Sequence, residues 1–227
     1  MSHFWEHQLH AIREQVLMMS GLTERNLALA MRSLVERDDK LTGMVEAEDN
    51  QIDQLEIHID DMVVTFIATH GAVASDTRFV LTASKIASNL ERIADEATTI
   101  ARRARELNSE PLLKPLIDIP IMADIAQEML RDGITAFVEQ KPDLAVEIIG
   151  RDRTVDDVYK QLVRELTTYM IESPKTITRA LNLMTVAKAL ERVADHATNI
   201  AEEVFYLYRG KDIRHDQTLK GRAQPAE

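Results

Sequence analysis

Apolar side chains recur at helical spacing along most of the chain. In the N-terminal segment, Trp5, Leu9, Ile12, Val16 and Met19 follow one another at intervals of four and three residues. These intervals place all five side chains on one face of an α-helix, because one helical turn contains about 3.6 residues. The same rhythm returns in later segments, separated by breaks in the pattern. The hydrophobic pattern therefore predicts an all-α protein.

Six helices follow once the residues that begin and end helices are included. Gly71 and Gly210 are typical of helix C-termini, and Asp76 is typical of an N-cap. Ser173 followed by Pro174 predicts an N-cap with a proline in the first helical turn. The expected helices span about 3–38, 42–69, 77–107, 119–139, 141–171 and 175–208.

One connection divides the chain into two halves. It covers residues 108–120 and contains Pro111, Pro115 and Pro120, which makes it the only proline-rich connection between predicted helices. We therefore predict two repeated three-helix bundles related by a pseudo-twofold axis. The predicted parts are residues 1–110 for the first repeat, 111–210 for the second repeat, and 211–227 for a mobile C-terminal tail that is polar and without periodicity.

A repeated phrase supports the division into halves. Residues 89–101 read NLERIADEATTIA, and residues 189–201 read ALERVADHATNIA. Each copy contains a Glu and an Asp four residues apart, and the middle helix of each half contains two Asp at the same spacing. The eight carboxylates are Glu91 and Asp95, Glu191 and Asp195, Asp49 and Asp53, and Asp152 and Asp156.

Each of these acidic pairs is a local liability for its helix. Like charges four residues apart share a helix face and cost about 0.2–0.5 kcal/mol per pair, so four pairs cost about 1–2 kcal/mol. A cation would remove this cost, and clustered carboxylates suit hard metal ions. The alternative is that these acids are solvated charges at the border of buried stripes, neutralised by neighbouring basic residues. Four pairs at matching positions in two repeats favour a metal.

Composition and motifs narrow the function further. The chain has 227 residues, a net charge of −11 and no Cys, which disfavours nucleic-acid binding and excludes disulfides and thiolate metal sites. No stretch of sequence predicts a signal peptide or a transmembrane segment, so a soluble, cytoplasmic protein is expected. Glu-xx-His pairs and catalytic motifs are missing, and His196 is expected on the surface. The sequence predicts no catalytic residue.

Two three-helix repeats, each ending in ERxAD followed by ATxIA, resemble the PhoU family of bacterial phosphate-signalling regulators. The resemblance covers nearly the whole chain, up to FYLYRGKDIRH after the second phrase. It implies an oligomeric cytoplasmic adaptor, attached to the inner membrane only through its partners. Those implied partners are the ATPase subunit of the phosphate ABC transporter and the phosphate sensor histidine kinase. The implied role is repression of phosphate-starvation genes when phosphate is ample.

The resemblance also implies metal clusters, with Fe, Zn, Mn or Mg as candidate ions. Carried across by motif, the ligands are Glu91, Asp95, Glu191 and Asp195, joined by Asp49, Asp53, Asp152 and Asp156 on the neighbouring helices. A homodimer is expected, with aromatic residues near the chain ends as contacts: Phe4, Trp5, Phe205, Tyr206 and Tyr208. Two alternatives stay open, an accessory protein of a different phosphate carrier and a carboxylate-metal enzyme.

Overall fold

The computed structural model describes residues 2–69 and 74–214. Over these residues the chain forms six long helices and no strand, which confirms the predicted all-α class. The helices are α1 (Ser2–Val35), α2 (Asp39–Thr69), α3 (Ala74–Asn108), α4 (Asp118–Glu139), α5 (Pro142–Glu172) and α6 (Ile177–Arg209), with a short 3₁₀ turn at Pro174–Thr176.

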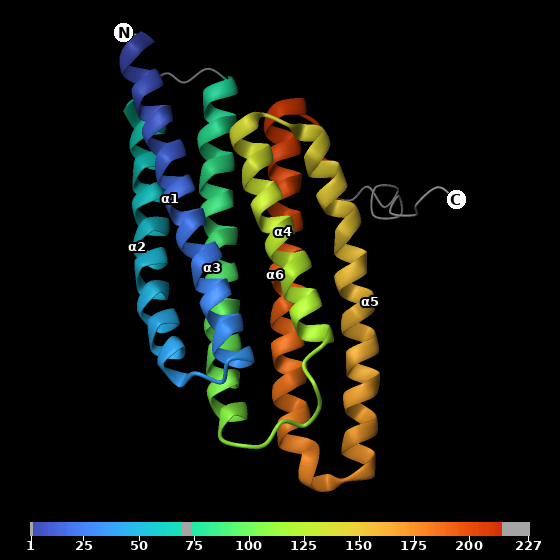
Figure 1. The fold of residues 1–227 in the computed structure, drawn as a ribbon. Coiled ribbons are helices and arrows are strands. Elements are labelled where there is room, and N and C mark those ends of the chain that lie inside the picture. Colours follow the sequence, from blue (N-terminus) through green and yellow to red (C-terminus); the bar gives the residue numbers. More distant parts are fainter. Residues whose placement is uncertain (1, 70–73, 215–227) are drawn as a thin grey trace, which may run out of the picture.

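The six helices lie side by side in an elongated array (Figure 1). Helices α1, α2 and α3 run down, up and down to form one half, and α4, α5 and α6 run up, down and up to form the other. Helices α3 and α6 lie at the centre and pack extensively on each other. The two predicted three-helix halves are confirmed, and they meet along this central pair.

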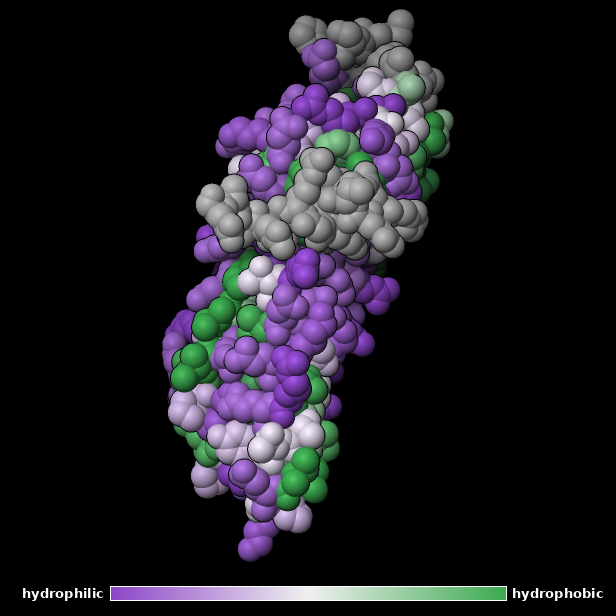
Figure 2. Space-filling model, turned by 90° about the vertical axis from the view of Figure 1, so that its right-hand side faces the viewer, coloured by the Kyte–Doolittle hydropathy of each residue, from purple (hydrophilic) through white to green (hydrophobic). Residues whose placement is uncertain are grey.

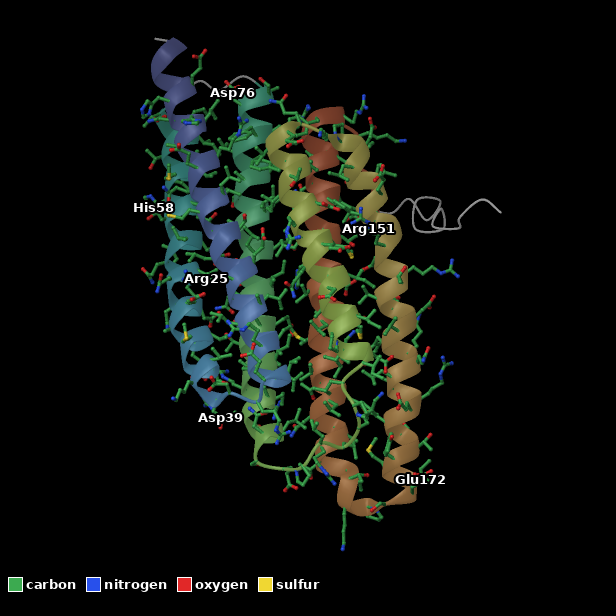
Figure 3. The ribbon with its side chains drawn as sticks, viewed as in Figure 1. Arg25, Asp39, His58, Asp76, Arg151 and Glu172 are labelled. Atoms are coloured by element: carbon green, nitrogen blue, oxygen red, sulfur yellow. The ribbon has the colours of Figure 1, made fainter. Side chains whose placement is uncertain are left out.

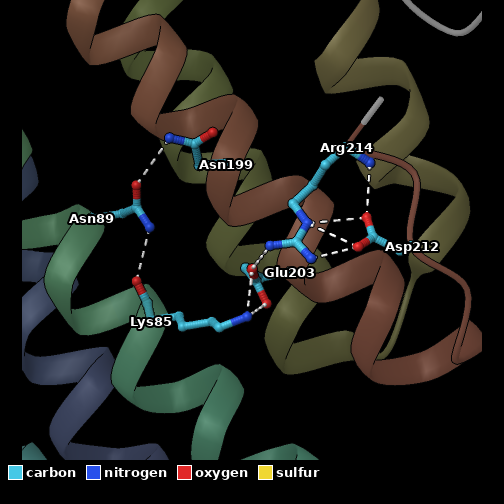
Figure 4. Close-up of polar contacts among 6 residues, drawn as sticks. All are labelled: Lys85, Asn89, Asn199, Glu203, Asp212 and Arg214. Atoms are coloured by element: carbon cyan, nitrogen blue, oxygen red, sulfur yellow. Dashed lines mark hydrogen bonds and ion pairs between the residues drawn. The ribbon is translucent and has the colours of Figure 1, made fainter. Parts of the chain in front are cut away.

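Side-chain contacts show that α3 and α6 are antiparallel. The Nζ of Lys85 lies 3.0 Å from Oε1 of Glu203, and Nδ2 of Asn199 donates to Oδ1 of Asn89 at 3.3 Å (Figure 4). Residues early in α3 therefore face residues late in α6. The ion pair is completed by Arg214, which follows α6 and lies 3.9 Å from the same Glu203 carboxylate.

A continuous hydrophobic core passes through both halves. The central helices contribute small, fully buried residues such as Ala94, Ala97 and Ala194, which let helix backbones approach closely. Aromatic packing also joins the halves, because the rings of Phe79 on α3 and Phe137 on α4 stack with centroids 5.8 Å apart. Each half therefore depends on the other to cover its apolar face.

Several predicted helix ends need correction. Helix α1 ends at Val35 rather than near residue 38, because Arg37 adopts a left-handed conformation with φ 58°. This turn aims the Arg37 guanidinium at the C-terminal end of α3, where it donates to the carbonyl oxygens of Asn108 at 2.7 Å and Glu110 at 2.6 Å. The last four carbonyl groups of a helix lack partners within it, and Arg37 donates to two of them, those of Asn108 and, at 3.4 Å, Leu107, from a distant part of the sequence.

The remaining signals at helix ends have mixed outcomes. Gly210 caps α6 with φ 67°, as predicted, whereas Asp76 lies inside the first turn of α3 instead of preceding it. Pro120 lies in the first turn of α4 rather than in the connection. Ser173 precedes the 3₁₀ turn, but its side chain makes no capping hydrogen bond. Gly71 and most of the predicted tail, residues 215–227, lie outside the described residues.

The surface around α5 is largely polar. The face formed around α5 shows mostly hydrophilic residues, with apolar ones in separate patches (Figure 2). Charged and polar side chains project outward along the helices, as His58 does on α2 and Glu172 at the end of α5 (Figure 3). None of the helices in the described part of the chain combines the length and the apolarity that crossing a lipid bilayer requires.

Candidate metal centres

The eight predicted ligands lie on two pairs of adjacent helices. In the first repeat, Asp49 and Asp53 are on α2, and Glu91 and Asp95 are on α3. Three of these four residues are half-buried and Asp95 is exposed; the equivalent positions on α5 and α6 show the same pattern. This is the placement that helical geometry predicts for residues at the border of a buried stripe.

The two repeated phrases pack against each other across the central helices. Nη1 of Arg192 lies 3.1 Å from Oε1 of Glu96, and the ring Nδ1 of His196 lies 3.0 Å from Oδ1 of Asn89. The phrases therefore meet at the same level of the antiparallel α3–α6 pair. The acidic motifs they carry lie toward α2 in one half and α5 in the other.

The predicted surface position of His196 is wrong. The residue is half-buried, because the direction that leads away from the core of its own half leads into α3 of the other half. Burial, followed by the positive charges of Arg92 and Arg192, lowers the pKa of His196. A neutral imidazole is therefore favoured at this junction.

Glu91 is the most perturbed carboxylate of the first repeat. Burial, reinforced by the negative charge of Asp95, raises the pKa of Glu91 to about 7. Its side chain is 18% exposed, and Arg92 lies 3.4 Å from Oε2, which partly offsets the effect. Despite this neighbour, Oε2 is buried and accepts no hydrogen bond. Buried carboxylate oxygens normally have a donor, so this atom is a candidate metal ligand.

Asp49 links the motif on α2 to the motif on α3. Burial, followed by the charges of Asp53 on its own helix and Asp95 on the next, raises the pKa of Asp49. Its Oδ1 is also buried without a hydrogen-bond partner. The charges of the two motifs of the first repeat therefore act on each other across the α2–α3 contact.

Sequence reasoning missed Glu56, which extends this cluster. It lies one helical turn after Asp53 on the same face of α2, and burial raises its pKa, with Ser88 opposing that effect and Asp60 reinforcing it. The spacing of three residues from Asp53 was a usable signal. It was overlooked because the equivalent residue in the second repeat is Tyr159, so the position is not part of the repeated acidic pattern.

The second repeat has the same motifs but different neighbours. The Nζ of Lys188 lies 2.5 Å from Oε2 of Glu191 and 5.5 Å from the ring centroid of Tyr159. Lys160 lies 3.5 Å from Oδ2 of Asp156 on α5. Carboxylates on both helices of this repeat are therefore already paired with ammonium groups.

The donor chemistry of the motifs fits a hard metal ion. All eight residues supply carboxylate oxygens, and Asp49 and Glu91 each leave one buried oxygen without a hydrogen-bond donor. Across residues 2–69 and 74–214, however, no three acidic or imidazole side chains are close enough together to hold one ion as they stand. Binding therefore requires the carboxylates to change rotamer toward a common point between the helices.

Comparison with known proteins identifies the relatives of the chain. The family model for the PhoU domain matches twice, over residues 16–104 and 119–204. A phosphate-specific transport system accessory protein PhoU homolog from Pseudomonas putida is 41% identical over 92% of this chain and 82% of its own length. The PhoU homolog from Aquifex aeolicus is 40% identical over 92% of this chain and 94% of its own length. The PhoU protein of Escherichia coli is 36% identical over 92% of this chain and 86% of its own length.

Solved structures show the same architecture. The crystal structure of PhoU from Pseudomonas aeruginosa superposes with a TM-score of 0.89 at 38% identity, covering 91% of this chain and all (100%) of that one. The crystal structure of the phosphate transport system regulatory protein PhoU from Streptococcus pneumoniae superposes with a TM-score of 0.85 at 25% identity. The match covers 91% of this chain and 98% of that one.

Proposed function

The chain belongs to the PhoU family, and from this premise we propose that it is an accessory and regulatory protein of phosphate transport. In detail, it acts as a helical adaptor between the ATPase subunit of the phosphate ABC transporter and the phosphate sensor histidine kinase. It represses phosphate-starvation genes when phosphate is ample. The observation that carries the proposal is the double match to the PhoU domain, once in each three-helix half.

The proposal includes metal binding by both acidic motifs. Asp49, Asp53, Glu91 and Asp95 would hold one site, and the equivalent residues of the second repeat would hold the other. A bound cation supplies positive charge that offsets the repulsion among these carboxylates. What the chain itself contributes is position, because α2 and α3, or α5 and α6, present the acids along one border. Fe, Zn, Mn and Mg are all compatible with carboxylate ligands.

Location and assembly follow from the same premise. We expect the protein in the cytoplasm, held at the membrane only through its partners, and we expect a homodimer. Of the aromatic residues predicted at the contact, Tyr206 is 38% exposed. The hydroxyl of Tyr208 instead donates a hydrogen bond to the carbonyl oxygen of Phe137 at 2.7 Å, so this side chain stabilises the packing of α6 on α4 within one chain. The side chains of Phe4 and Trp5 lie outside the described part of the structure. Light scattering at micromolar concentration tests the dimer, and a monomer alone would contradict it.

A genetic experiment tests the adaptor function. Deleting the gene in its own host should switch on a phosphate-starvation reporter in phosphate-rich medium, and the wild-type gene should restore repression. Tagged protein should capture the transporter ATPase and the histidine kinase from the same cells. A reporter that stays off in the deletion strain would contradict the proposal. Capture of a different phosphate carrier without the ATPase would favour the alternative accessory role.

A matched pair of variants tests whether the motifs matter. Replacing Glu91 and Asp95 with Gln and Asn removes two charges while keeping side-chain shape. The control replaces Asp124 and Glu128 on α4, which are also four residues apart but fully outside the motifs and exposed. We expect the motif variant to lose bound metal, measured by mass spectrometry, and to repress the reporter less well. Equal metal content and equal repression in both variants would remove the metal from the proposal. Metal-dependent turnover of a phosphate compound would instead support the enzyme alternative.

A further inference from the structure

The two acidic motifs are not equivalent in charge, although their repeated residues match. In the alignment of the repeated phrases, Ser88 of α3 is equivalent to Lys188 of α6, one hundred residues later. In the alignment of the middle helices, Glu56 of α2 is equivalent to Tyr159 of α5. At these two positions, next to the predicted ligands, the second repeat has a lysine in place of a serine and a tyrosine in place of a carboxylate. At a third aligned position it has Glu202 in place of Arg102.

In the second repeat the lysine lies on the motif itself. Nζ of Lys188 is 2.5 Å from Oε2 of Glu191, whose side chain is only 13% exposed, and the ammonium also lies over the face of Tyr159. A charge-assisted contact to a mostly buried carboxylate is stronger than an exposed ion pair. The acidic motif therefore already holds a cation, supplied by the chain one turn before the ligand.

In the first repeat no lysine takes that place. Ser88 is near Glu56, and the hydroxyl of the neighbouring Ser84 lies 2.5 Å from Oδ1 of Asp60, so hydroxyl groups occupy this border. One basic group at the motif is Arg92, which lies 3.4 Å from Glu91 and 4.0 Å from Asp95 and is 60% exposed. A second is Arg102, which is 63% exposed, pairs with Glu46 at 3.3 Å and acts through its charge on Asp49. An exposed guanidinium at these distances neutralises a motif only weakly.

The arginine at the equivalent position of the second repeat does not reverse this difference. Arg192 reaches across the central helices to Glu96 of the first repeat, 3.1 Å away. The first cluster contains more carboxylates as well. Glu56 adds a fifth carboxylate, whose charge acts on Glu91, to the four motif residues of the first repeat, whereas Tyr159 stands at the equivalent position of the second.

From these contacts we propose that Lys188 is a built-in counterion that makes the two motifs unequal cation sites. The first repeat binds a divalent metal ion preferentially, and the second binds one only when Lys188 is displaced. This inference rests on the metal binding included in the proposed function. It adds that the first repeat binds the metal ion before the second, and that Lys188 determines this order.

A reciprocal exchange of the two aligned residues tests the inference. Ser88→Lys gives the first repeat the lysine of the second, and Lys188→Ser gives the second repeat the serine of the first. Mn²⁺ alone is titrated calorimetrically into the full chain after chelator treatment, and bound metal is counted by mass spectrometry. The wild type should show one tight event that Glu91→Gln with Asp95→Asn abolishes, and a second event roughly tenfold weaker or more.

The exchange variants should move affinity in opposite directions. Lys188→Ser should tighten the second event by roughly tenfold, and Ser88→Lys should weaken the first by a similar factor. Lys175→Ser, which removes an exposed lysine away from the motifs, should leave both events unchanged. Thermal melting with and without Mn²⁺ gives an independent readout and shows that each variant is folded. If Ser88→Lys fails to fold, the Lys188→Ser result alone decides.

The outcomes separate this inference from the proposed function. Equal affinity at both repeats of the wild type, or no change in Lys188→Ser, would overturn the inference while leaving metal binding in place. No Mn²⁺ binding by the wild type or by Lys188→Ser would overturn both the inference and the metal part of the proposed function. The adaptor role would still be judged by the reporter strain.

Discussion

The strongest single test of the electrostatics is Glu91→Gln, measured without metal. In the native chain Glu91 has a pKa of about 7, against 4.5 for an unperturbed glutamate. At about 1.4 kcal/mol per pH unit, this pKa difference corresponds to at most roughly 3.5 kcal/mol. Because part of the side chain meets solvent and Arg92 lies nearby, we expect about 1–3 kcal/mol in practice. Gln keeps the shape and removes the charge.

The sign follows from proton binding. The folded-state pKa lies above the unfolded value, so the native state binds more protons than the unfolded state between pH 4.5 and about 7. The contribution of Glu91 to stability is therefore fully present below pH 4.5 and is lost as the pH rises through 7. Glu91→Gln should have little effect on the free energy of unfolding near pH 4.5 and should stabilise the protein at pH 8.

Urea unfolding followed by circular dichroism, with chelator throughout, measures this difference at several pH values. The matched control is Glu191→Gln at the equivalent position of the second repeat. That variant loses the ion pair with Lys188 and should destabilise the protein by about 0.5–1 kcal/mol at pH 8, opposite in sign. A destabilised Glu91→Gln at pH 8, or the same sign for both variants, would refute the reasoning.

Three further substitutions test packing and helix ends by urea unfolding at pH 7. Glu203→Ala should destabilise by about 1–1.5 kcal/mol, because the half-exposed Lys85 loses its carboxylate partner, and a loss under 0.5 kcal/mol would show that the pair is dispensable. Tyr208→Phe should cost about 0.5–1.5 kcal/mol by removing the hydrogen bond to Phe137, and an unchanged midpoint would contradict this. Gly210→Ala should cost about 1–2 kcal/mol, because φ is 67° there, and a stabilised variant would show that this turn can relax.

The fold was largely predictable because its information is local. Intervals of three and four residues place the buried stripe of each helix, and Gly210 ends α6 because a residue without Cβ suits φ 67°. The end of α1 was not predictable in the same way. Arg37 adopts a positive φ although it is not glycine. The hydrogen bonds that compensate for this strain go to carbonyl groups at the end of α3, more than seventy residues away in the sequence.

The positions of the candidate carboxylates on their helices were predictable, but the partners of these side chains were not. Helical spacing alone places Glu91 and Glu191 at the border of their stripes. It does not say that Lys188 turns toward Glu191 whereas Arg192 turns toward Glu96 of the other half. Both basic residues are within reach of an acid on their own helix. Their choice depends on how the halves pack, which also explains the buried position of His196.

The central α3–α6 contact makes the chain comparable to a dimer whose two subunits have been fused. A separate half would expose the alanine-rich face of its third helix, and a second copy of that half would be the natural surface to cover it. In such a symmetric dimer, every substitution would appear in both subunits at once. Fusion into one chain lifts that constraint, so serine at one position and lysine at its counterpart can coexist. A single molecule can then carry two acidic motifs with different neighbouring charges on one six-helix frame.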